Sequence, residues 1–374
     1  MEPSDTLSLF ATAAKGTEGL LRDELREGRF RRVKATRGGV AFEGTLSDAL
    51  RACLELRIAQ RVLVRLREFP CTSANELYEG CAAIPWFAWT STRKTFAVRV
   101  EGRAEGLVHS GFAALRVKDA IVDTFRARSG ARPSVDREAP EFSVFVLLKD
   151  GLAMVYADAS GEPLFKRGYR SAALEAPLKE TLAAAIVRWS GYRGDGDFID
   201  PMCGSGTLAI EAGMLARSLA PGLARAAFAV ETFEPFGDAE RRFARHRRQE
   251  LVEASEPTRP LRLLVADSNP AACDLAQRNA SRVGLELLVR TGSLETIELP
   301  RPEATIVTNP PYGERLASSA PLLHGLERLM ELDWRSLHVL AGAPFIEAAF
   351  RPRPSRWLAL SNGDLPVRLL SFER

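Results

Sequence analysis

The C-terminal half of the chain alternates short apolar strands with helices, and this order constrains the fold more than any other feature. The pattern predicts strand 198–200, helix 208–217, strand 261–266, helix 270–283, and strands 287–291 and 305–308. Such alternation is typical of a parallel sheet with helices on both faces. Further strands at 337–340, 357–360 and 367–371 end the chain, the last two as a hairpin at the sheet edge. We therefore expect a doubly wound α/β domain over residues 197–374.

The first 160 residues predict a different, α+β organisation. Strands at 8–11, 32–36, 40–43 and 61–69 with helices at 16–27 and 46–56 follow the order β-α-β-β-α-β of a ferredoxin-like unit, residues 1–70. Residues 71–160 then read as helix 75–83, strand 95–101, amphipathic helix 111–128 and a hairpin, 142–148 with 152–158, that turns at Asp150-Gly151. A linker with a first helix at 178–189 occupies 161–196. Because no catalytic constellation is recognisable before residue 160, we interpret this region as an accessory binding module.

Composition excludes several classes of protein. No apolar run approaches the roughly 20 residues that span a bilayer, and the acidic start at residues 1–5 lacks the features of a signal peptide, so a cytoplasmic protein is expected. The five cysteines form no Cys-x-x-Cys pair, and with four histidines they suggest no metal site. The net charge of +3 alone does not argue for nucleic acid, and the basic clusters at 22–37 and 241–248 are most simply solvated helix faces.

The first chemical signal is a glycine-rich loop between the first strand and helix of the α/β domain. Its candidate cofactor-binding residues are Asp200, Pro201, Gly204, Ser205, Gly206 and Thr207. The two glycines let a ligand approach the backbone, and the helix N-terminus that follows favours an anionic group, either a phosphate or an amino-acid carboxylate. A tight turn without a ligand would produce the same glycine pattern.

Asp267 directly follows the next strand, where a carboxylate would face a ligand ribose across the switch point of the sheet. In a dinucleotide enzyme this acid is expected about 20 residues after the glycines, whereas here a long charged insertion, 221–260, intervenes. A nucleoside-type cofactor is therefore favoured. The alternative role for Asp267 is to cap the helix that begins near residue 270, and the two roles are compatible.

The sequence Asn309-Pro310-Pro311-Tyr312 follows strand 305–308 and is the most specific signal. Two prolines hold the backbone extended and remove two amide donors, which leaves the Asn309 side chain and the Pro310 carbonyl as convergent acceptors. Acceptors of this kind suit an exocyclic base amine, because accepting its hydrogens turns the lone pair toward an electrophile, and Tyr312 would stack on the base. The alternative is a rigid loop in which Asn309 only closes a turn.

These motifs together resemble the THUMP-domain RNA guanine-N2 methyltransferases, a family that includes the bacterial large-subunit ribosomal RNA enzyme (RlmL-like) and transfer-RNA relatives. The resemblance spans nearly the whole chain. It rests on Phe10-Ala11-Thr12 with Lys15-Gly16 and Glu18, on 117–121, on Arg167-Gly168-Tyr169-Arg170, on 176–180, on the glycine loop and on 309–316. It implies a ferredoxin-like and THUMP region before a class I methyltransferase domain with a Rossmann-like, seven-stranded sheet, and S-adenosylmethionine as the cofactor.

The resemblance also implies roles for individual residues. Asp200, Gly204 and Gly206 would hold the methionine part of the cofactor, Asp267 its ribose, and 309–312 the target base. Where such enzymes often have an acid that contacts adenine, this chain has Gly292-Ser293-Leu294, so Ser293 or Glu295 would serve. The additional methyltransferase half of some larger relatives does not follow in this sequence. Candidate RNA-phosphate contacts, each with surface solvation as its alternative, are Lys118, Arg167, Arg170, Lys179 and Arg315.

The expected function is therefore transfer of a methyl group to the 2-amino group of a guanine in 23S ribosomal RNA, by a monomer that uses no metal and no membrane. Three alternatives stay open: the same chemistry on a transfer-RNA guanine, adenine-N6 methylation of DNA, and a catalytically silent RNA-binding assembly factor.

Overall fold

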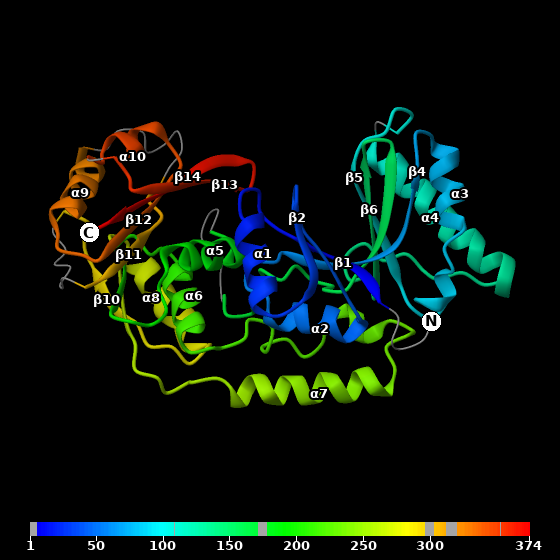
Figure 1. Cartoon of the computed structure of the whole chain (residues 1–374), viewed down its shortest axis with the longest axis horizontal. Coiled ribbons are helices and arrows are strands. Elements are labelled where there is room, and N and C mark those ends of the chain that lie inside the picture. Colours follow the sequence, from blue (N-terminus) through cyan, green and yellow to red (C-terminus); the bar gives the residue numbers. More distant parts are fainter. Residues whose placement is uncertain (1–5, 108, 171–177, 296–302, 312–319, 352) are drawn as a thin grey trace.

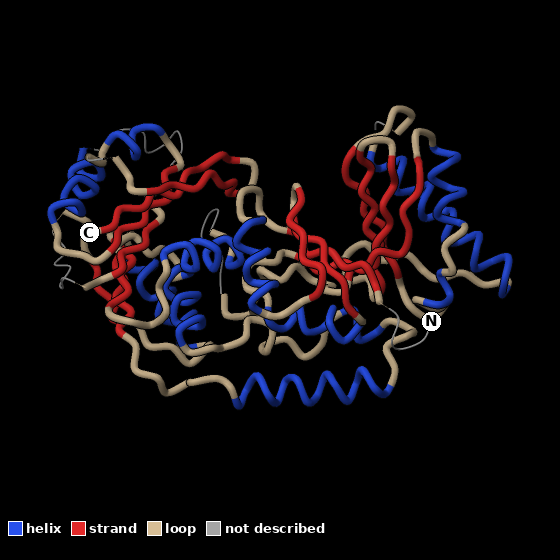
Figure 2. Tube along the Cα trace, viewed as in Figure 1, coloured by secondary structure: helices blue, strands red, loops and turns tan. Residues whose placement is uncertain are grey.

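The computed structural model describes residues 6–107, 109–170, 178–295, 303–311, 320–351 and 353–374. These residues form two lobes, each built on its own seven-stranded sheet (Figures 1 and 2). In Figure 1 the N-terminal half lies at the centre and right, and the C-terminal half lies at the left.

The N-terminal lobe has one mixed sheet in the order β2-β3-β1-β4-β7-β6-β5. Its strands are β1 (Leu7–Thr12), β2 (Arg31–Thr36), β3 (Gly39–Gly44), β4 (Arg61–Pro70), β5 (Phe96–Gly102), β6 (Phe142–Lys149) and β7 (Leu152–Asp158). Its helices are α1 (Glu18–Glu27), α2 (Leu46–Glu55), α3 (Ala74–Ala82), the 3-10 turn η1 (Trp86–Ala88) and α4 (Ser110–Ser129). The sub-order β4-β1-β3-β2 is the expected ferredoxin-like unit. Because β4 also pairs with β7, the two predicted N-terminal domains share one continuous sheet.

Local sequence explains several boundaries in this lobe. Helices α2 and α3 begin at capping boxes, in which Thr45 pairs with Asp48 and Ser73 with Glu76. Asp150 and Gly151 have φ angles of 52° and 74°, as the tight turn between β6 and β7 requires. The predicted helices and strands of this region are therefore present, with ends that differ by one or two residues.

The C-terminal lobe has the sheet order β10-β9-β8-β11-β12-β14-β13; β14 runs antiparallel to β12 and β13, and the other paired strands are parallel. Its strands are β8 (Asp197–Asp200), β9 (Arg262–Asp267), β10 (Leu288–Thr291), β11 (Thr305–Thr308), β12 (Ser336–Ala341), β13 (Arg356–Asn362) and β14 (Leu365–Glu373). Its helices are α5 (Glu180–Ser190), α6 (Thr207–Ala216), α7 (Asp238–Glu253), α8 (Pro270–Ser281), α9 (Ala320–Glu331), α10 (Pro344–Ala348) and the turn η2 (Ala229–Thr232). The expected doubly wound fold with a hairpin edge is confirmed, whereas α9 and α10 were not expected from the sequence.

Neighbouring residues of the parallel strands point to opposite faces of this sheet and into separate cores. Phe198 and Val307 pack with apolar residues of α5, α6 and α8 on one face. Ile199 and Ile306 pack with residues of α9 and α10 on the other. Strands that are buried on both faces consist of continuous apolar runs rather than alternating patterns, which is why their sequence signal was clear.

The charged insertion between α6 and β9 connects the two lobes. Its apolar residues Phe228, Val230, Phe233 and Phe236 are buried in the core of the N-terminal lobe rather than of their own. The 16-residue helix α7 follows and runs along the base of the molecule, where it packs on α2 (Figure 1). The insertion therefore holds the N-terminal lobe against the C-terminal lobe, a role that its polar composition does not indicate.

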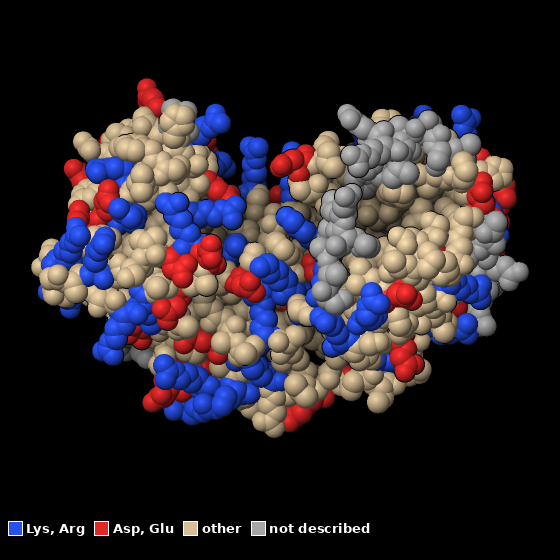
Figure 3. Space-filling view, turned by 180° about the vertical axis from the view of Figure 1, so that it is seen from behind, with Lys and Arg blue, Asp and Glu red and all other residues tan. Residues whose placement is uncertain are grey.

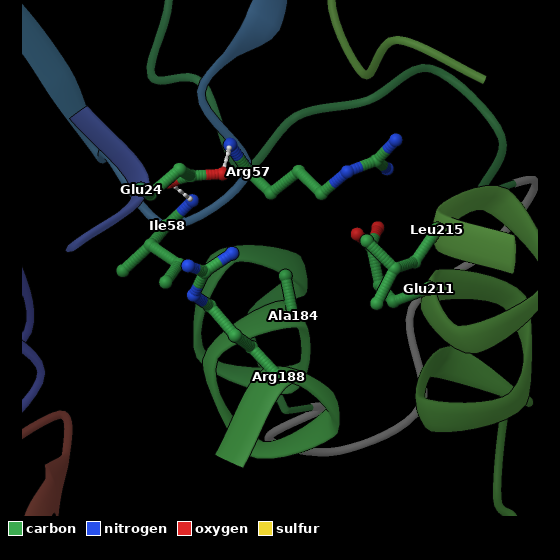
Figure 4. A pocket seen from close by; sticks show the side chains of 7 residues that line it. All are labelled: Glu24, Arg57, Ile58, Ala184, Arg188, Glu211 and Leu215. Carbon is green, nitrogen blue, oxygen red and sulfur yellow. Dashed lines mark hydrogen bonds between the residues drawn. The ribbon is translucent and has the colours of Figure 1, made fainter. Parts of the chain in front are cut away.

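Charged side chains of both lobes surround a small cavity at the lobe interface (Figure 4). Glu24 of α1 accepts hydrogen bonds from the backbone amides of Arg57 and Ile58, at 2.8 and 3.2 Å, and burial raises its pKa. The Arg57 side chain extends toward Glu211 of α6 and donates to the Leu219 carbonyl at 2.8 Å. Because buried charges are costly without partners, these contacts favour one arrangement of the lobes. Among the described helices, none is both long enough and apolar enough to cross a membrane.

Candidate active site

The predicted glycine loop lies at the carboxyl edge of the C-terminal sheet, between β8 and α6. Gly204 and Gly206 have φ angles of 51° and 80°, which favour glycine. A Cβ atom on Gly206 would lie 2.9 Å from Ala276 Cβ, so the loop packs closely on α8. Gly206 is the N-cap residue of α6, and no side chain among the described residues caps this end of the helix. The amides of the first turn can therefore donate to a ligand. The loop therefore has the backbone geometry and the donors that an anionic cofactor group needs.

Asp267 ends the adjacent strand β9 and contacts the loop directly. Its Oδ2 accepts from the Gly204 amide at 2.9 Å, and its Oδ1 accepts from the Asn269 amide at 2.9 Å. The cap of α8 is Asn269, which accepts from the Ala271 amide at 3.0 Å. Asp267 is thus not the helix cap, and each carboxylate oxygen retains a lone pair that can accept from a ligand hydroxyl.

Asp200 ends β8 beside the same loop and is buried, with an exposed fraction of 1%. It accepts from the Met202 amide at 3.3 Å. Burial, and to a smaller extent the charge of Asp267, raises the pKa of Asp200 to about 7. A carboxyl group that is costly to ionise without a partner is suited to a ligand that brings a positive charge.

Asn309 and the two prolines follow β11 at the same edge of the sheet. Asn309 Oδ1 is buried and has no hydrogen-bond partner among the residues that the structure describes. Pro310 is buried and Pro311 is exposed. A buried amide oxygen without a partner is costly, and a ligand N–H group would satisfy it. Tyr312, the expected stacking residue, lies outside the described residues.

The edge of the sheet therefore brings together side chains that are far apart in sequence. Strand β8 pairs with both β9 and β11, which places the ends of these strands side by side. Ser293 lies two residues beyond the end of β10, at the same edge, and Arg328 donates to the Glu295 carbonyl at 2.6 Å. The adenine contact proposed for Ser293 or Glu295 stays a prediction.

The structure assigns internal partners to two of the predicted RNA-contacting arginines. Arg167 has an exposed fraction of 3%, its Nε lies 3.6 Å from Glu211, and it donates to the carbonyls of Leu164 and Arg57. An RNA phosphate therefore has no access to its guanidinium group here, and the expected phosphate contact is corrected to a structural contact. Arg170 contacts Thr207 of the glycine loop at 3.0 Å.

The other predicted basic contacts remain at or near the surface. Lys118 of α4 is partly exposed and lies 2.6 Å from Asp119. Lys179 Nζ lies 5.2 Å from the centre of the Phe165 ring. Arg315 lies outside the described residues. Lys118 and Lys179 are therefore still candidates for RNA contact.

Sequence reasoning missed Asn279, a fully buried residue of α8. Its side-chain amide donates to the Ser205 carbonyl at 3.1 Å and so fixes the glycine loop against α8. The available signal was a lone polar residue beside Ala276 and Ala280 on the apolar face of this helix.

Comparison with known protein families matches three successive parts of the chain. Residues 8–63 match the RlmL ferredoxin-like domain, residues 71–158 match the THUMP domain, and residues 167–333 match the RMKL-like methyltransferase domain. These three matches follow one another in the order that the sequence predicted.

Solved structures show the same fold over the whole chain. SMU.472, named as a methyltransferase and crystallised with SAH, is 30% identical, with a TM-score of 0.88 over 100% of this chain and 99% of its own. A predicted N6-adenine-specific DNA methylase from Listeria monocytogenes is 29% identical, with a TM-score of 0.87 over 98% and 96% of the two chains. TrmN from Thermus thermophilus, 20% identical over 99% and 100%, has a TM-score of 0.70 and shares the fold. S-adenosylmethionine is thus the cofactor, and the chain belongs to the family of RlmL-like THUMP methyltransferases.

Proposed function

We propose that this methyltransferase modifies the 2-amino group of a guanine in large-subunit ribosomal RNA. The observation that carries the proposal is the buried Oδ1 of Asn309, which has no hydrogen-bond partner among the described residues and lies beside the loop that would hold the cofactor. An exocyclic amine would supply an N–H donor to this oxygen. The THUMP domain at 71–158 supports a structured RNA as the substrate, because it adds a second surface to a complete methyltransferase domain.

In the proposed mechanism the target nucleotide leaves its stack and enters the edge of the sheet. Asn309 Oδ1 and the Pro310 carbonyl accept the two amine hydrogens, which draws the nitrogen toward tetrahedral geometry and points its lone pair away from the ring. When bound, S-adenosylmethionine supplies an electrophilic methyl group on a positively charged sulfur. Asp200, the glycine loop and Asp267 would hold the methionine and ribose parts in line with the amine. Methylation makes the amine acidic, so its proton leaves to water and no general base is required.

The shape and charge of the molecule support an extended, anionic substrate. Strand β2 is an outer strand of the N-terminal sheet and lies near the middle of the molecule (Figure 1). Figure 3 shows lysine and arginine side chains beside the notch between the lobes, together with aspartate and glutamate side chains. On β2 and the turn after it, the exposed basic residues are Arg31, Arg32, Lys34 and Arg37. Such charges also protect an edge strand from pairing with other chains, so RNA binding must be measured directly.

A single comparative assay tests this function. Labelled S-adenosylmethionine is incubated with unmodified ribosomal RNA, unmodified transfer RNA and duplex DNA, and the labelled nucleoside is identified. Label in 2-methylguanosine from ribosomal RNA is expected. Label in transfer RNA would move the substrate to that RNA, and label in N6-methyladenine would favour the activity named for the Listeria relative. Label in none of the correctly folded substrates would favour a silent binding protein.

The variant Asn309→Ala tests the chemistry within the same assay. It removes the amide oxygen but none of the groups that would hold the cofactor. SAH affinity should therefore stay within about twofold of wild type, while methyl transfer falls at least about a hundredfold, as when a transition-state hydrogen bond is removed. Near-normal turnover of this variant would show that Asn309 does not accept the amine.

A further inference from the structure

Arg170 lies in the segment that joins the two lobes, and its side chain reaches the first residue of α6. Its Nη2 donates to Thr207 Oγ1 at 3.0 Å and also to the Leu178 carbonyl. Its Nε lies 3.0 Å from Oε1 of Glu180, the first residue of α5. The guanidinium group is therefore held by α5 on one side and contacts α6 on the other.

Thr207 links Arg170 to the glycine loop. Its Oγ1 lies 3.2 Å from Ser205 Oγ, and both residues are buried. Glycines have more backbone freedom than other residues, so a loop with Gly204 and Gly206 at positive φ needs contacts from outside to keep one conformation. Asn279 supplies such a contact through the Ser205 carbonyl, and Arg170 supplies another through Thr207.

This arrangement differs from that of a phosphate-binding arginine. The Arg170 side chain is only 19% exposed, and its donors already face Glu180, Thr207 and the Leu178 carbonyl. A phosphate contact requires accessible donors and a charge that is not already paired. Lys166, four residues earlier, has a side chain that is 55% exposed, and it forms an ion pair with Glu162 on the surface.

We propose that Arg170 is a positioning residue for the cofactor: it orders the glycine loop through Thr207 and sets the affinity for S-adenosylmethionine rather than for RNA. The inference rests on the proposed placement of the cofactor in this loop. It assigns the segment between the lobes a direct role in forming the cofactor site.

The test compares Arg170→Gln with the surface control Lys166→Gln. SAH binding is measured by calorimetry, RNA binding is measured over a range of salt concentrations, and hydrogen exchange of 203–207 is followed without ligand. For Arg170→Gln we expect SAH affinity at least about tenfold weaker, the scale of a lost charge-assisted hydrogen bond. Exchange in 203–207 should be faster, and RNA affinity and its salt dependence should be unchanged. Lys166→Gln should leave SAH binding and exchange unchanged.

Variants of Thr207 separate positioning from a general loss of structure. Thr207→Val removes the hydroxyl and should weaken SAH binding, whereas Thr207→Ser, which keeps the hydroxyl, should weaken it less. Adding Arg170→Gln to Thr207→Val should cause little further loss, because both changes remove the same contact.

Three results would overturn the inference. The first is unchanged SAH affinity and exchange in Arg170→Gln, and the second is full additivity of the two changes. The third is weaker RNA binding with a salt slope reduced by about one, as for a phosphate contact. If the wild-type protein did not bind SAH, the cofactor site itself would be wrong, and the inference would fail with it.

Discussion

Cofactor binding should release a proton from Asp200 near neutral pH. Burial raises the pKa of this carboxyl to about 7 in the free protein. In the proposed site the positively charged amino group of the cofactor's methionine part lies near Asp200 and favours the ionised carboxylate. At low pH, Asp200 must lose its proton when the cofactor binds, and the free energy that this ionisation costs makes binding weaker.

The size of the effect follows from the pKa. With a pKa of about 7, Asp200 is roughly nine-tenths ionised at pH 8 and roughly one-tenth ionised at pH 6. If the complex requires the ionised form, affinity should fall about tenfold between these pH values, which corresponds to about 1.4 kcal/mol.

Stability of the free protein should change with pH in the opposite direction. The folded-state pKa of Asp200 is raised, so its contribution to stability is greatest below the ordinary carboxyl pKa. That contribution is lost as pH rises through about 7.

The assay is calorimetric titration with SAH at several pH values, in buffers with different ionisation enthalpies that count the protons released. Asp200→Asn is the matched control, because it has nearly the same shape and cannot titrate. Any titration of the ligand itself is common to both proteins and cancels in the comparison. Between pH 6 and pH 8, the SAH affinity of the wild-type protein should rise about tenfold more than that of Asp200→Asn. Parallel pH profiles for the two proteins would refute the proposed contact.

Three further predictions concern the cofactor loop, the lobe interface and the RNA surface. Gly206→Ala places a Cβ 2.9 Å from Ala276 Cβ at a φ of 80°, so SAH affinity measured by calorimetry should be at least about tenfold weaker. The control Gly38→Ala is equally strained but lies in an open turn, and it should bind SAH normally. Glu211→Gln leaves the buried Arg167 without its carboxylate partner and should cost about 3 kcal/mol in urea denaturation, whereas a loss below about 1 kcal/mol would contradict the role of this ion pair. Three exposed basic residues of β2 and its turn can be replaced together by glutamine: Arg31, Lys34 and Arg37. The slope of log affinity for RNA against log salt concentration should then fall by up to about 0.9 per lost contact, and an unchanged slope would exclude this surface.

Much of the fold was predictable because its signals are local. Strands β8 and β9 end in an acid and β11 is followed by an asparagine, and these positions predict that the three polar residues meet at one edge of the sheet. The turn at Asp150-Gly151 and the capping residues of α2 and α3 are likewise encoded within a few positions. Helices α9 and α10 were missed, and the ends of other elements shifted by one or two residues, because tertiary packing decides where a helix stops.

The sequence by itself determined the order of the elements, the glycine loop and the Asn309 motif, because backbone preferences and short-range spacing carry that information. Only the tertiary structure decided what the charged residues contact. Arg170 meets Thr207 across 37 positions, and Arg167 meets Arg57 across 110, so no local pattern distinguishes them from surface arginines. The aromatic residues of the insertion likewise appeared to belong to a polar loop, whereas they complete the core of the other lobe. Long-range burial and charge pairing depend on which surfaces the fold brings together, and that is known only once the chain has folded.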